Sequence, residues 1–388
     1  MERRTDKKTG KKVSLLGFGT MRLPKISNDA PEIDEAKAME LIDYAYTHGV
    51  NYYDTAYPYH AGLSELFIGK ALARYPRESF FLADKMPGWK MKDLDGAKRI
   101  FAEQLKKCRV GYFDFYLCHS LGSSLGEFTE EYEKTGVLRY LDSLRRSGVI
   151  RHLGFSFHGK PEVLEQLVTR LDWDFTQIQL NYLDWDMQNA KRQYTILENR
   201  HLPCIVMEPV RGGTLCSLSP EAASLLKTEE PGRSLASWAI RFAASQPNVL
   251  TVLSGMSAMD QVQDNVATME HFQPVTEHET ALLGRAAASY LSHGTIPCTG
   301  CRYCMDCPFG VDIPRTFTAY NRCAAANRLP LSFGGAENGS YFREAYESVP
   351  EINRPTHCRN CGRCVKLCPQ KINIPRRLRE IAELASNC

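Results

Sequence analysis

Eight short apolar segments alternate with longer amphipathic segments up to about residue 270. Segments such as 34–49 and 94–111 have the 3.6-residue periodicity of helices, and each ends at a glycine typical of a helix C-cap. Short apolar runs separated by helices are typical of parallel strands. The predicted strands are 14–21, 50–56, 80–86, 112–120, 150–157, 175–182, 203–209 and 249–255. Eight such repeats predict an α/β fold of the (β/α)₈ TIM-barrel type, although a doubly wound sheet has a similar alternation.

Polar side chains lie at the ends of four successive predicted strands. They are Asp54, Lys85, His119 and Ser156. In a parallel barrel the carboxyl ends of the strands converge on one mouth, where such side chains meet. One polar residue alone would simply begin a loop, but four in succession favour a shared site.

Composition narrows the classes of function. The chain has 388 residues, of which 43% are hydrophobic and 24% charged, as in ordinary globular proteins. Its net charge of +3 is too small to indicate a nucleic-acid partner, and we expect the basic N-terminal stretch 2–8 to be a solvated edge. No apolar run approaches the ~18 residues of a membrane span, and no secretory signal is recognisable. We therefore expect a cytoplasmic protein without a membrane span.

Two cysteine-rich segments, 298–317 and 358–378, repeat one pattern. Each holds C-x₂-C-x₂-C, then a fourth cysteine directly before a proline, and each continues to Ile-Pro-Arg. Fourteen cysteines without an export signal indicate metal-binding thiolates rather than disulfides. The repeat has the form of a two-cluster ferredoxin, in which three thiolates of one segment bind one [4Fe–4S] cluster and the fourth reaches the other cluster.

This pattern assigns two sets of ligands. One cluster takes Cys298, Cys301, Cys304 and Cys368, and the other takes Cys358, Cys361, Cys364 and Cys307. The first segment has two residues instead of three before its last cysteine, which leaves Cys323 as an alternative to Cys307. Zinc is the competing metal, but it explains neither the third cysteine nor the Cys-Pro step. The pattern therefore favours two [4Fe–4S] clusters.

The change in composition near residue 290 divides the chain. We expect a barrel domain over residues 1–275, a linker helix over 276–294 and a small ferredoxin-like domain of helices and loops over 295–388.

The residue types at the predicted barrel mouth suit the reduction of a carbonyl group by a nicotinamide. A lysine ammonium group near Tyr59 favours the phenolate and so eases release of the phenol proton. A carboxylate such as Asp54 keeps the lysine charged, and His119 can orient the carbonyl oxygen.

The segment 54–60, DTAYPYH, resembles the D-x₄-Y element of the aldo/keto reductase family through Asp54 and Tyr59. Lys85 and His119 follow at similar intervals, and the segment LGFGTMRL resembles the first strand of that family's barrel. The resemblance implies a catalytic tetrad of Asp54, Tyr59, Lys85 and His119, with Tyr59 as general acid and base. Tyr57 is an alternative phenol that the spacing disfavours. With its cysteine segments, the whole chain resembles the iron–sulfur group of this family.

The resemblance also implies positions for a nicotinamide cofactor. Ser156 and Gln177 match residues that hold the carboxamide, and Met207 stands where an aromatic side chain often stacks on the ring, unless it is simply a core residue. The family's usual asparagine after Ser156 is Phe157 here. Further matches are Gly212 and Gly213 for the pyrophosphate and the acid–Asn pair Asp264 and Asn265.

Relatives that use NADPH carry a lysine and an arginine after the last strand, where this chain has Gly255 and Gln261. Without these cations a 2′-phosphate loses its charge-assisted hydrogen bonds. We therefore expect NAD(H) to be preferred over NADP(H). A flavin is not excluded, because a barrel mouth can bind FMN without a short motif.

Three interpretations of the combined domains stay open. In the first, an NAD(P)H-dependent oxidoreductase acts on a small carbonyl or alcohol and its clusters transfer electrons to or from a redox partner protein. Hydride carries two electrons and each cluster carries one, so this interpretation normally requires a flavin. In the second, the clusters are structural or redox-sensing. In the third, the chain is a non-catalytic nicotinamide sensor or electron carrier, against which the complete tetrad argues.

Overall fold

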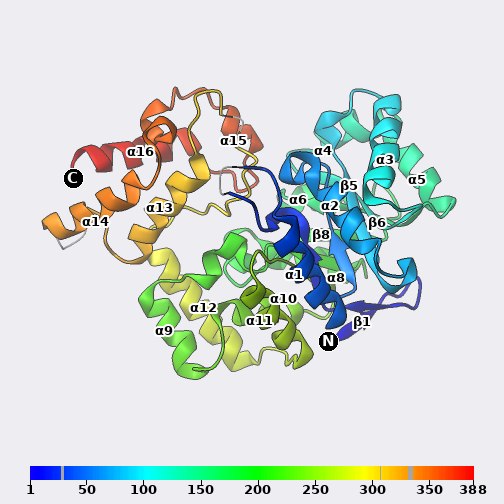
Figure 1. Cartoon of the computed structure of the whole chain (residues 1–388), viewed down its shortest axis with the longest axis horizontal. Helices are drawn as coiled ribbons and strands as arrows, with labels where there is room; N and C mark the ends of the chain where they lie inside the picture. Colours follow the sequence, from blue (N-terminus) through cyan, green and yellow to red (C-terminus); the bar gives the residue numbers. More distant parts are fainter. Residues whose placement is uncertain (28–29, 306, 331–334) are drawn as a thin grey trace. The chain divides into compact units, whose positions relative to one another are not determined.

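The computed structural model describes residues 1–27, 30–305, 307–330 and 335–388 (Figure 1). The contacts of the chain divide it into two units. The first contains Met1–Pro209 and Ser237–Val275, and the second contains Val210–Ala236 and Thr276–Cys388.

The first unit is built on a closed barrel of eight parallel strands, so the predicted (β/α)₈ fold is confirmed. The strands follow one another around the barrel in sequence order, and the last pairs with both the first and the seventh. All eight predicted strands are present. They are β3 (Leu16–Gly19), β4 (Tyr52–Asp54), β5 (Phe81–Met86), β6 (Phe113–Leu121), β7 (Ile150–Phe157), β8 (Phe175–Gln179), β9 (Cys204–Met207) and β10 (Val249–Gly255).

Helices connect the strands. They include α1 (Glu35–Thr47), α2 (Leu63–Leu72), α3 (Leu94–Cys108), α4 (Leu125–Phe128), α5 (Val137–Arg146), α6 (Pro161–Leu167), α7 (Asp184–Met187), α8 (Ala190–Asn199), α10 (Leu235–Ala244) and α11 (Met259–Glu270). Gly49 follows α1 with a φ of 88°, as a C-cap glycine should. The expectation for α3 is wrong, because its left-handed cap is Arg109, with a φ of 56°, and not Gly111.

The barrel interior consists of an apolar layer with a polar layer above it. Residues two apart on a strand point to the same face. Two positions after each apolar interior residue, nearer the carboxyl end of the strand, the next interior side chain is polar or a thioether. The apolar members include Tyr52, Ala83, Leu117, Phe175 and Ile205. Two positions further along the same strands lie Asp54, Lys85, His119, Gln177 and Met207. The strand register therefore gathers the predicted site residues above the core.

A two-stranded hairpin of β1 (Arg3–Thr5) and β2 (Lys12–Ser14) precedes the barrel. Here the expectation of a solvated N-terminal edge is wrong for Arg4. Its guanidinium group is partly buried and donates hydrogen bonds to the carbonyl oxygens of Ala244, Gln246 and Val249. Burial lowers the pKa of Arg4. This arginine thus satisfies carbonyl groups at the end of α10 and the start of β10.

The second unit is helical. Its helices are α9 (Pro220–Glu229), α12 (Glu277–Ser292), α13 (Ile313–Ala325), α14 (Gly335–Glu347), α15 (Arg363–Leu367) and α16 (Ile374–Ser386). Residues 210–236, which the sequence places in the barrel domain, belong to this unit because α9 packs on α12 and Arg211 donates to the carbonyl oxygen of Pro297 at 3.2 Å. The helix expected over 276–294 corresponds to α12. No helix in the described ranges is long and apolar enough to cross a membrane.

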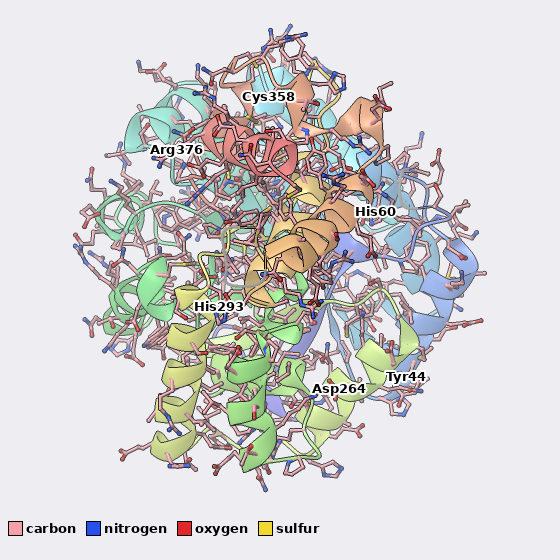
Figure 2. All side chains as sticks on the ribbon, turned by 90° about the vertical axis from the view of Figure 1, so that its left-hand side faces the viewer. Tyr44, His60, Asp264, His293, Cys358 and Arg376 are labelled. Atoms are coloured by element: carbon pink, nitrogen blue, oxygen red, sulfur yellow. The ribbon has the colours of Figure 1, made fainter. Side chains whose placement is uncertain are left out.

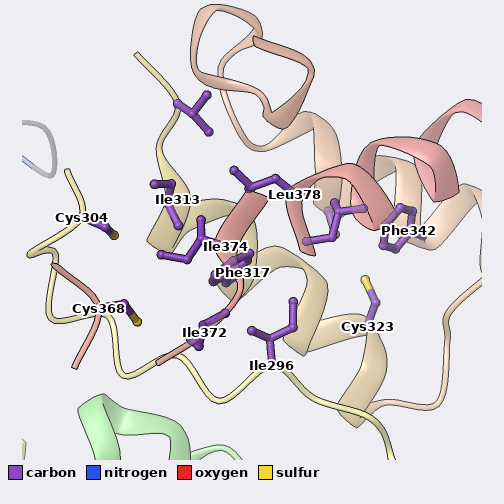
Figure 3. Packing of buried hydrophobic residues seen from close by; sticks show 13 residues of the cluster. Ile296, Cys304, Ile313, Phe317, Cys323, Phe342, Cys368, Ile372, Ile374 and Leu378 are labelled. Atoms are coloured by element: carbon purple, nitrogen blue, oxygen red, sulfur yellow. The ribbon is translucent and has the colours of Figure 1, made fainter. Parts of the chain in front are cut away.

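The internal repeat is visible in the second unit as two similarly built helices. Asp312 accepts a hydrogen bond from the backbone nitrogen of Arg315 and caps α13, while Asn373 caps α16 through the backbone nitrogen of Arg376. In both helices a proline occupies the first turn, where its missing N–H costs nothing. The two helices contribute to one apolar cluster, which includes Ile313, Phe317, Cys323, Phe342, Ile374 and Leu378 (Figure 3).

One buried ion pair ties the hairpin to the barrel. The Asp6 carboxylate lies 2.9 Å from Nε2 of His152 and also accepts from the Thr9 hydroxyl. The His152 ring stacks on Phe115, with centroids 4.4 Å apart. Burial alone would raise the pKa of Asp6, but the hydrogen bonds from His152 and Thr9 outweigh it and lower the pKa to about 2. The ionised carboxylate therefore stabilises the fold.

We expect Asp6→Asn to lower the free energy of unfolding at neutral pH by on the order of 1 kcal/mol. A carboxyl group whose folded pKa is depressed stabilises the fold above its unfolded pKa, and this is lost as the pH falls through the folded pKa. The difference between wild type and variant should therefore shrink as the pH falls from about 4.5 towards 2. Urea unfolding at several pH values measures this difference in the free energy of unfolding, with Asp95→Asn at an exposed position as the control. If the stability difference between wild type and Asp6→Asn did not change with pH, the lowered pKa of Asp6 would be contradicted.

Candidate functional site

A buried lysine organises the mouth of the barrel. Nζ of Lys85 lies 2.5 Å from Oδ1 of Asp54 and 2.7 Å from the carbonyl oxygen of Thr55. Both charged side chains are at most 4% exposed. Burial raises the pKa of Asp54, and the Lys85 ammonium group opposes that rise. The pair is mutually compensating, because removal of either charge leaves the other buried alone.

Tyr59 reaches the same point from the 3₁₀ turn η2 (Tyr59–Gly62), which follows β4. Its hydroxyl lies 3.5 Å from Nζ of Lys85. Burial raises the pKa of Tyr59 well above its ordinary value, Asp54 and Glu208 raise it further, and Arg22 opposes them. The expectation that lysine makes this phenol easier to deprotonate is thus overruled in the free protein. Tyr59 is a neutral phenol and can donate its proton.

His119 completes the group of four. Its ring meets that of Tyr59 edge to face, with centroids 6.2 Å apart. Burial lowers the pKa of His119 well below its ordinary value, and the charges of Lys85 and His158 lower it further. At neutral pH the imidazole is therefore uncharged. The structure brings all four residues of the predicted tetrad together, whereas Tyr57 turns its hydroxyl toward Glu103, 3.5 Å away.

A polar network behind β5 supports Lys85. The amide of Gln104 donates to the Lys85 carbonyl oxygen and to the buried Glu65 carboxylate, each at 3.0 Å. Lys107 pairs with the same carboxylate at 3.1 Å. Burial raises the pKa of Asp84 well above its ordinary value, and the nearby Glu65 charge adds to the effect. These contacts fix the backbone of β5 at the position that carries the ammonium group.

Sequence reasoning missed three side chains at the mouth. Arg22 and Glu208 form an ion pair at 3.7 Å, and both charges act on Tyr59. The alkyl stem of Arg22 lies against Gly255, where a Cβ atom would be 3.3 Å from it. Trp89, 46% exposed, lies 5.1 Å from the His119 ring. The only sequence signal was their place directly after strands β3, β9 and β5.

Two predicted nicotinamide contacts lie on adjacent strands, since Ser156 of β7 pairs with Gln177 of β8. The Gln177 amide nitrogen donates to Asp54 at 3.3 Å, and its buried Oε1 atom has no hydrogen-bond partner among the described residues. The Ser156 hydroxyl accepts from the backbone nitrogen of Ser120 at 2.7 Å and keeps its own proton to donate. A carboxamide offers both the N–H and the carbonyl oxygen that these two groups lack, so the residues fit a nicotinamide.

The other predicted cofactor contacts are more dispersed. Met207 ends β9 of the first unit and is half-buried, while Gly212 and Gly213 belong to the second unit. Both glycines have positive φ, 65° and 95°, within the 3₁₀ segment η6 (Arg211–Cys216), so the turn itself requires them. Asp264 lies on α11, which packs beside α1, the helix of Tyr44 (Figure 2). Asn265 is buried and donates to the Ser254 hydroxyl at 2.9 Å.

The first predicted cluster site is a cavity within the second unit. It is lined by Cys298, Cys301, Cys304 and Cys368, together with Ile313, Phe317 and Ile374 of the apolar cluster. Cys304 and Cys368 lie at one end of that cluster (Figure 3). Burial, with smaller contributions from Cys301 and Cys368, raises the pKa of Cys298 to about 12. The structure thus places the fourth cysteine of the second segment beside three cysteines of the first, as in a swapped ligand set.

The second predicted set is grouped around Cys364. Burial, with smaller contributions from the neighbouring Cys358, Cys307 and Cys361, raises the pKa of this thiol to about 11. Cys307 therefore lies with the cysteines of the other segment. Among the described residues no three His, Cys, Asp or Glu side chains are grouped closely enough for a single metal ion. Both sets join three closely spaced cysteines with one distant in sequence, which suits the ligation of [4Fe–4S] clusters.

The other cysteines occupy different environments. Cys323, the alternative ligand, is buried on α13 beside Phe317 and Phe342, and burial raises its pKa to about 11. Of those without ligand spacing, Cys108, Cys118 and Cys204 are buried, Cys216 is exposed and Cys388 is half-buried.

Comparisons with known proteins extend this description. The chain is 26% identical over 288 residues to L-galactose dehydrogenase of Arabidopsis thaliana, with 68% of this chain and 87% of that protein covered. A solved structure of an aldo-keto reductase from Bacillus halodurans, in its holo form, superimposes with a TM-score of 0.61 at 26% identity. That match covers 74% of this chain and 96% of the other.

A further structure shares the fold. It is an aldo-keto reductase from Klebsiella pneumoniae in complex with NADPH, with a TM-score of 0.57 and 21% identity over 74% of this chain and 95% of that chain. Two family models match the sequence itself. Residues 297–383 match the 4Fe-4S dicluster domain and residues 15–286 match the aldo/keto reductase family. The protein is therefore a member of the aldo/keto reductase family that carries a C-terminal 4Fe-4S dicluster domain.

Proposed function

We propose that the protein is an NAD(H)-preferring oxidoreductase that interconverts a small carbonyl compound and its alcohol. The observation that carries this proposal is the neutral phenol of Tyr59 beside the buried Lys85–Asp54 pair and the uncharged His119. The nicotinamide, when bound, supplies or accepts the hydride. A non-catalytic sensor would have no use for a proton donor held in this way.

In the reducing direction Tyr59 donates its proton to the carbonyl oxygen of the substrate. The phenolate left behind is stabilised by the ammonium group 3.5 Å away, and Asp54 holds that group in position. Uncharged His119 orients the oxygen through a hydrogen bond without competing for the proton. In the oxidising direction the same phenolate takes the proton of the alcohol.

The preference for NAD(H) rests on the segment after β10. The Gln261 side chain accepts from the backbone nitrogen of Ser257 at 2.9 Å, and Asp260 adds a negative charge in the first turn of α11. An acidic residue there repels a 2′-phosphate. Arg22 is the cation against the Gly255 backbone, and its charge faces Glu208. The Klebsiella structure shows that the fold accommodates NADPH, so the choice depends on these side chains.

We propose that both cysteine sets hold [4Fe–4S] clusters that transfer electrons. Each cluster, when loaded, carries one electron at a time. The proposal is supported by the swapped grouping of the cysteines and by the match to the dicluster domain. Burial penalises the free thiolates, so the metal must provide the charge that keeps them ionised.

Replacement of Tyr59 tests the reaction. Tyr59→Phe should lower the kcat for a panel of small aldehydes and ketones by roughly 10²- to 10⁴-fold, because the proton donor is lost. NADH binding, followed by fluorescence titration, should be unchanged. Tyr57→Phe is the matched control, since this phenol is outside the tetrad, and it should stay within about twofold of wild type. Full turnover by Tyr59→Phe would contradict the proposal.

Parallel assays with the two cofactors test the preference. We expect kcat/KM to be about tenfold or more higher with NADH than with NADPH, because the 2′-phosphate lacks a charge-assisted partner. Gln261→Arg should improve kcat/KM with NADPH and leave the value with NADH nearly unchanged. Equal or better turnover of the wild type with NADPH would refute the preference.

Iron analysis tests the ligand sets. Cys368→Ser should lose about half of the iron and acid-labile sulfide, because only one of the two clusters loses a ligand. Cys323→Ala should retain both clusters and lose only packing energy, since Cys323 is buried in the apolar cluster. EPR of the reduced proteins measures the remaining cluster. A full complement of iron in Cys368→Ser, or loss of a cluster in Cys323→Ala, would show that the assignment is wrong.

A further inference from the structure

The two cysteine sets differ in their exposure. In the first set Cys304 and Cys368 are buried, each 8% exposed, and belong to the apolar cluster of the second unit. In the second set no cysteine is buried, and Cys361 is exposed. The loop with Cys358 can be followed in Figure 2. The second set is therefore the one that a partner can approach closely.

The sequence around the second set is strongly basic. Between residues 352 and 379 it contains eight lysines and arginines and no acidic residue. Arg359, Arg363, Lys366 and Lys371 are exposed, and none forms a salt bridge with a carboxylate of the described residues. These four cations alternate with cysteines 358, 361, 364 and 368. They place unpaired positive charge on the segment that carries three of the four cysteines of the second set.

Exposed apolar side chains lie on the same segments. Ile352 is 73% exposed, Leu367 49% and Phe309 41%. Asn353 joins two of these segments, because its amide donates to the carbonyl oxygen of Gly310 at 2.7 Å and its own carbonyl oxygen accepts from the backbone nitrogen of Asp312. Leu367 ends α15, the helix that contains Cys364. Apolar contact area is thus combined with positive charge around one ligand set.

We propose that this surface, which we name the basic docking surface and define by Phe309, Ile352, Arg359, Arg363, Lys366 and Leu367, binds a small acidic protein that carries single electrons. Its apolar side chains supply contact area, and its cations steer an acidic partner and set its orientation. Interfaces between electron-transfer proteins are typically small, below ~1,200 Å², so a few apolar side chains suffice. The inference rests on the proposed loading of the cysteines with clusters.

The pattern favours a protein over other polyanions. A nucleic acid would use the cations for its phosphates but would leave three exposed aliphatic and aromatic side chains without a purpose. An anionic lipid surface is bound through the free apolar face of an amphipathic helix, but α15 has only five residues and the apolar face of α16 is buried in the apolar cluster. The exposed Cys361 also gives a redox protein a reason to dock here.

An acidic flavodoxin serves as the probe, with binding measured by biolayer interferometry at low and at high ionic strength. The test variant combines Arg359→Glu, Arg363→Glu and Lys366→Glu. The control combines Lys227→Glu, Arg285→Glu and Arg343→Glu, which changes the net charge equally at exposed positions of the same unit. We expect wild type and control to bind alike, with affinity falling as salt rises. The test variant should bind at least tenfold more weakly.

Iron and sulfide analysis of each protein precedes the binding measurement. If the test variant loses iron, flavodoxin binding is measured with Leu367→Ser and Ile352→Ser instead. These variants remove apolar contact area without changing the charge, so each should bind flavodoxin more weakly than wild type. Equal weakening of test and control variants would overturn the proposal. So would an iron-loaded wild type that ignores flavodoxin, or one that binds anionic vesicles or duplex DNA more tightly. An iron-free wild type would instead contradict the proposed cluster loading.

Discussion

The ammonium group of Lys85 inside the barrel is the constraint on which the mouth of this protein depends. An unpaired charge in such a place would cost several kcal/mol, so the fold must deliver a carboxylate to it. Parallel pairing does this, because Asp54 ends β4 opposite Ala83, two residues before Lys85 on β5. The carbonyl oxygen of Thr55 completes the coordination of the ammonium group. With the lysine fixed, Tyr59 and Gln177 have defined partners, and a one-residue slip of β4 would leave the ammonium group without its carboxylate.

The same buried charges decide the protonation of Tyr59. A lysine at 3.5 Å favours phenolate, yet burial and three carboxylates, including Glu208, outweigh it. Glu208 has a φ of 55°, and its carbonyl oxygen is held by the amide of Asn181 at 3.0 Å. Its partner Arg22 reduces its influence on the phenol. A charged group that separated Arg22 from Glu208, such as a carboxylate of a substrate, would change the electrostatic field at the Tyr59 hydroxyl.

Local patterns in the sequence are enough to predict the barrel and to place Asp54, Lys85 and His119 at its mouth, whereas the grouping of these residues with Tyr59 comes from the resemblance to a family. Alternating apolar residues define each strand, and a polar residue two positions later marks its carboxyl end, as with Lys85. Arg22 and Glu208 could not be paired in this way, since their contact depends on which loops turn toward each other. The contacts that group residues 210–236 with the C-terminal helices could not be predicted either, because Arg211 donates to a carbonyl oxygen 86 residues further along the chain. Local patterns carry no information on such long-range contacts.

The cysteine repeat shows how one local pattern acquires two environments. Both halves have the same C-x₂-C-x₂-C spacing of their first three cysteines, a side-chain-capped helix and a proline in its first turn. Yet Cys304 and Cys368 pack against the apolar faces of these helices, while Cys361 faces solvent between basic residues. Burial and charge both tune the potential of an iron–sulfur site, since a cationic, solvated surrounding favours the added electron and an apolar one opposes it. With both sets holding clusters as proposed, these unequal surroundings would separate the two potentials and give electron transfer a direction between the core and the surface of the module.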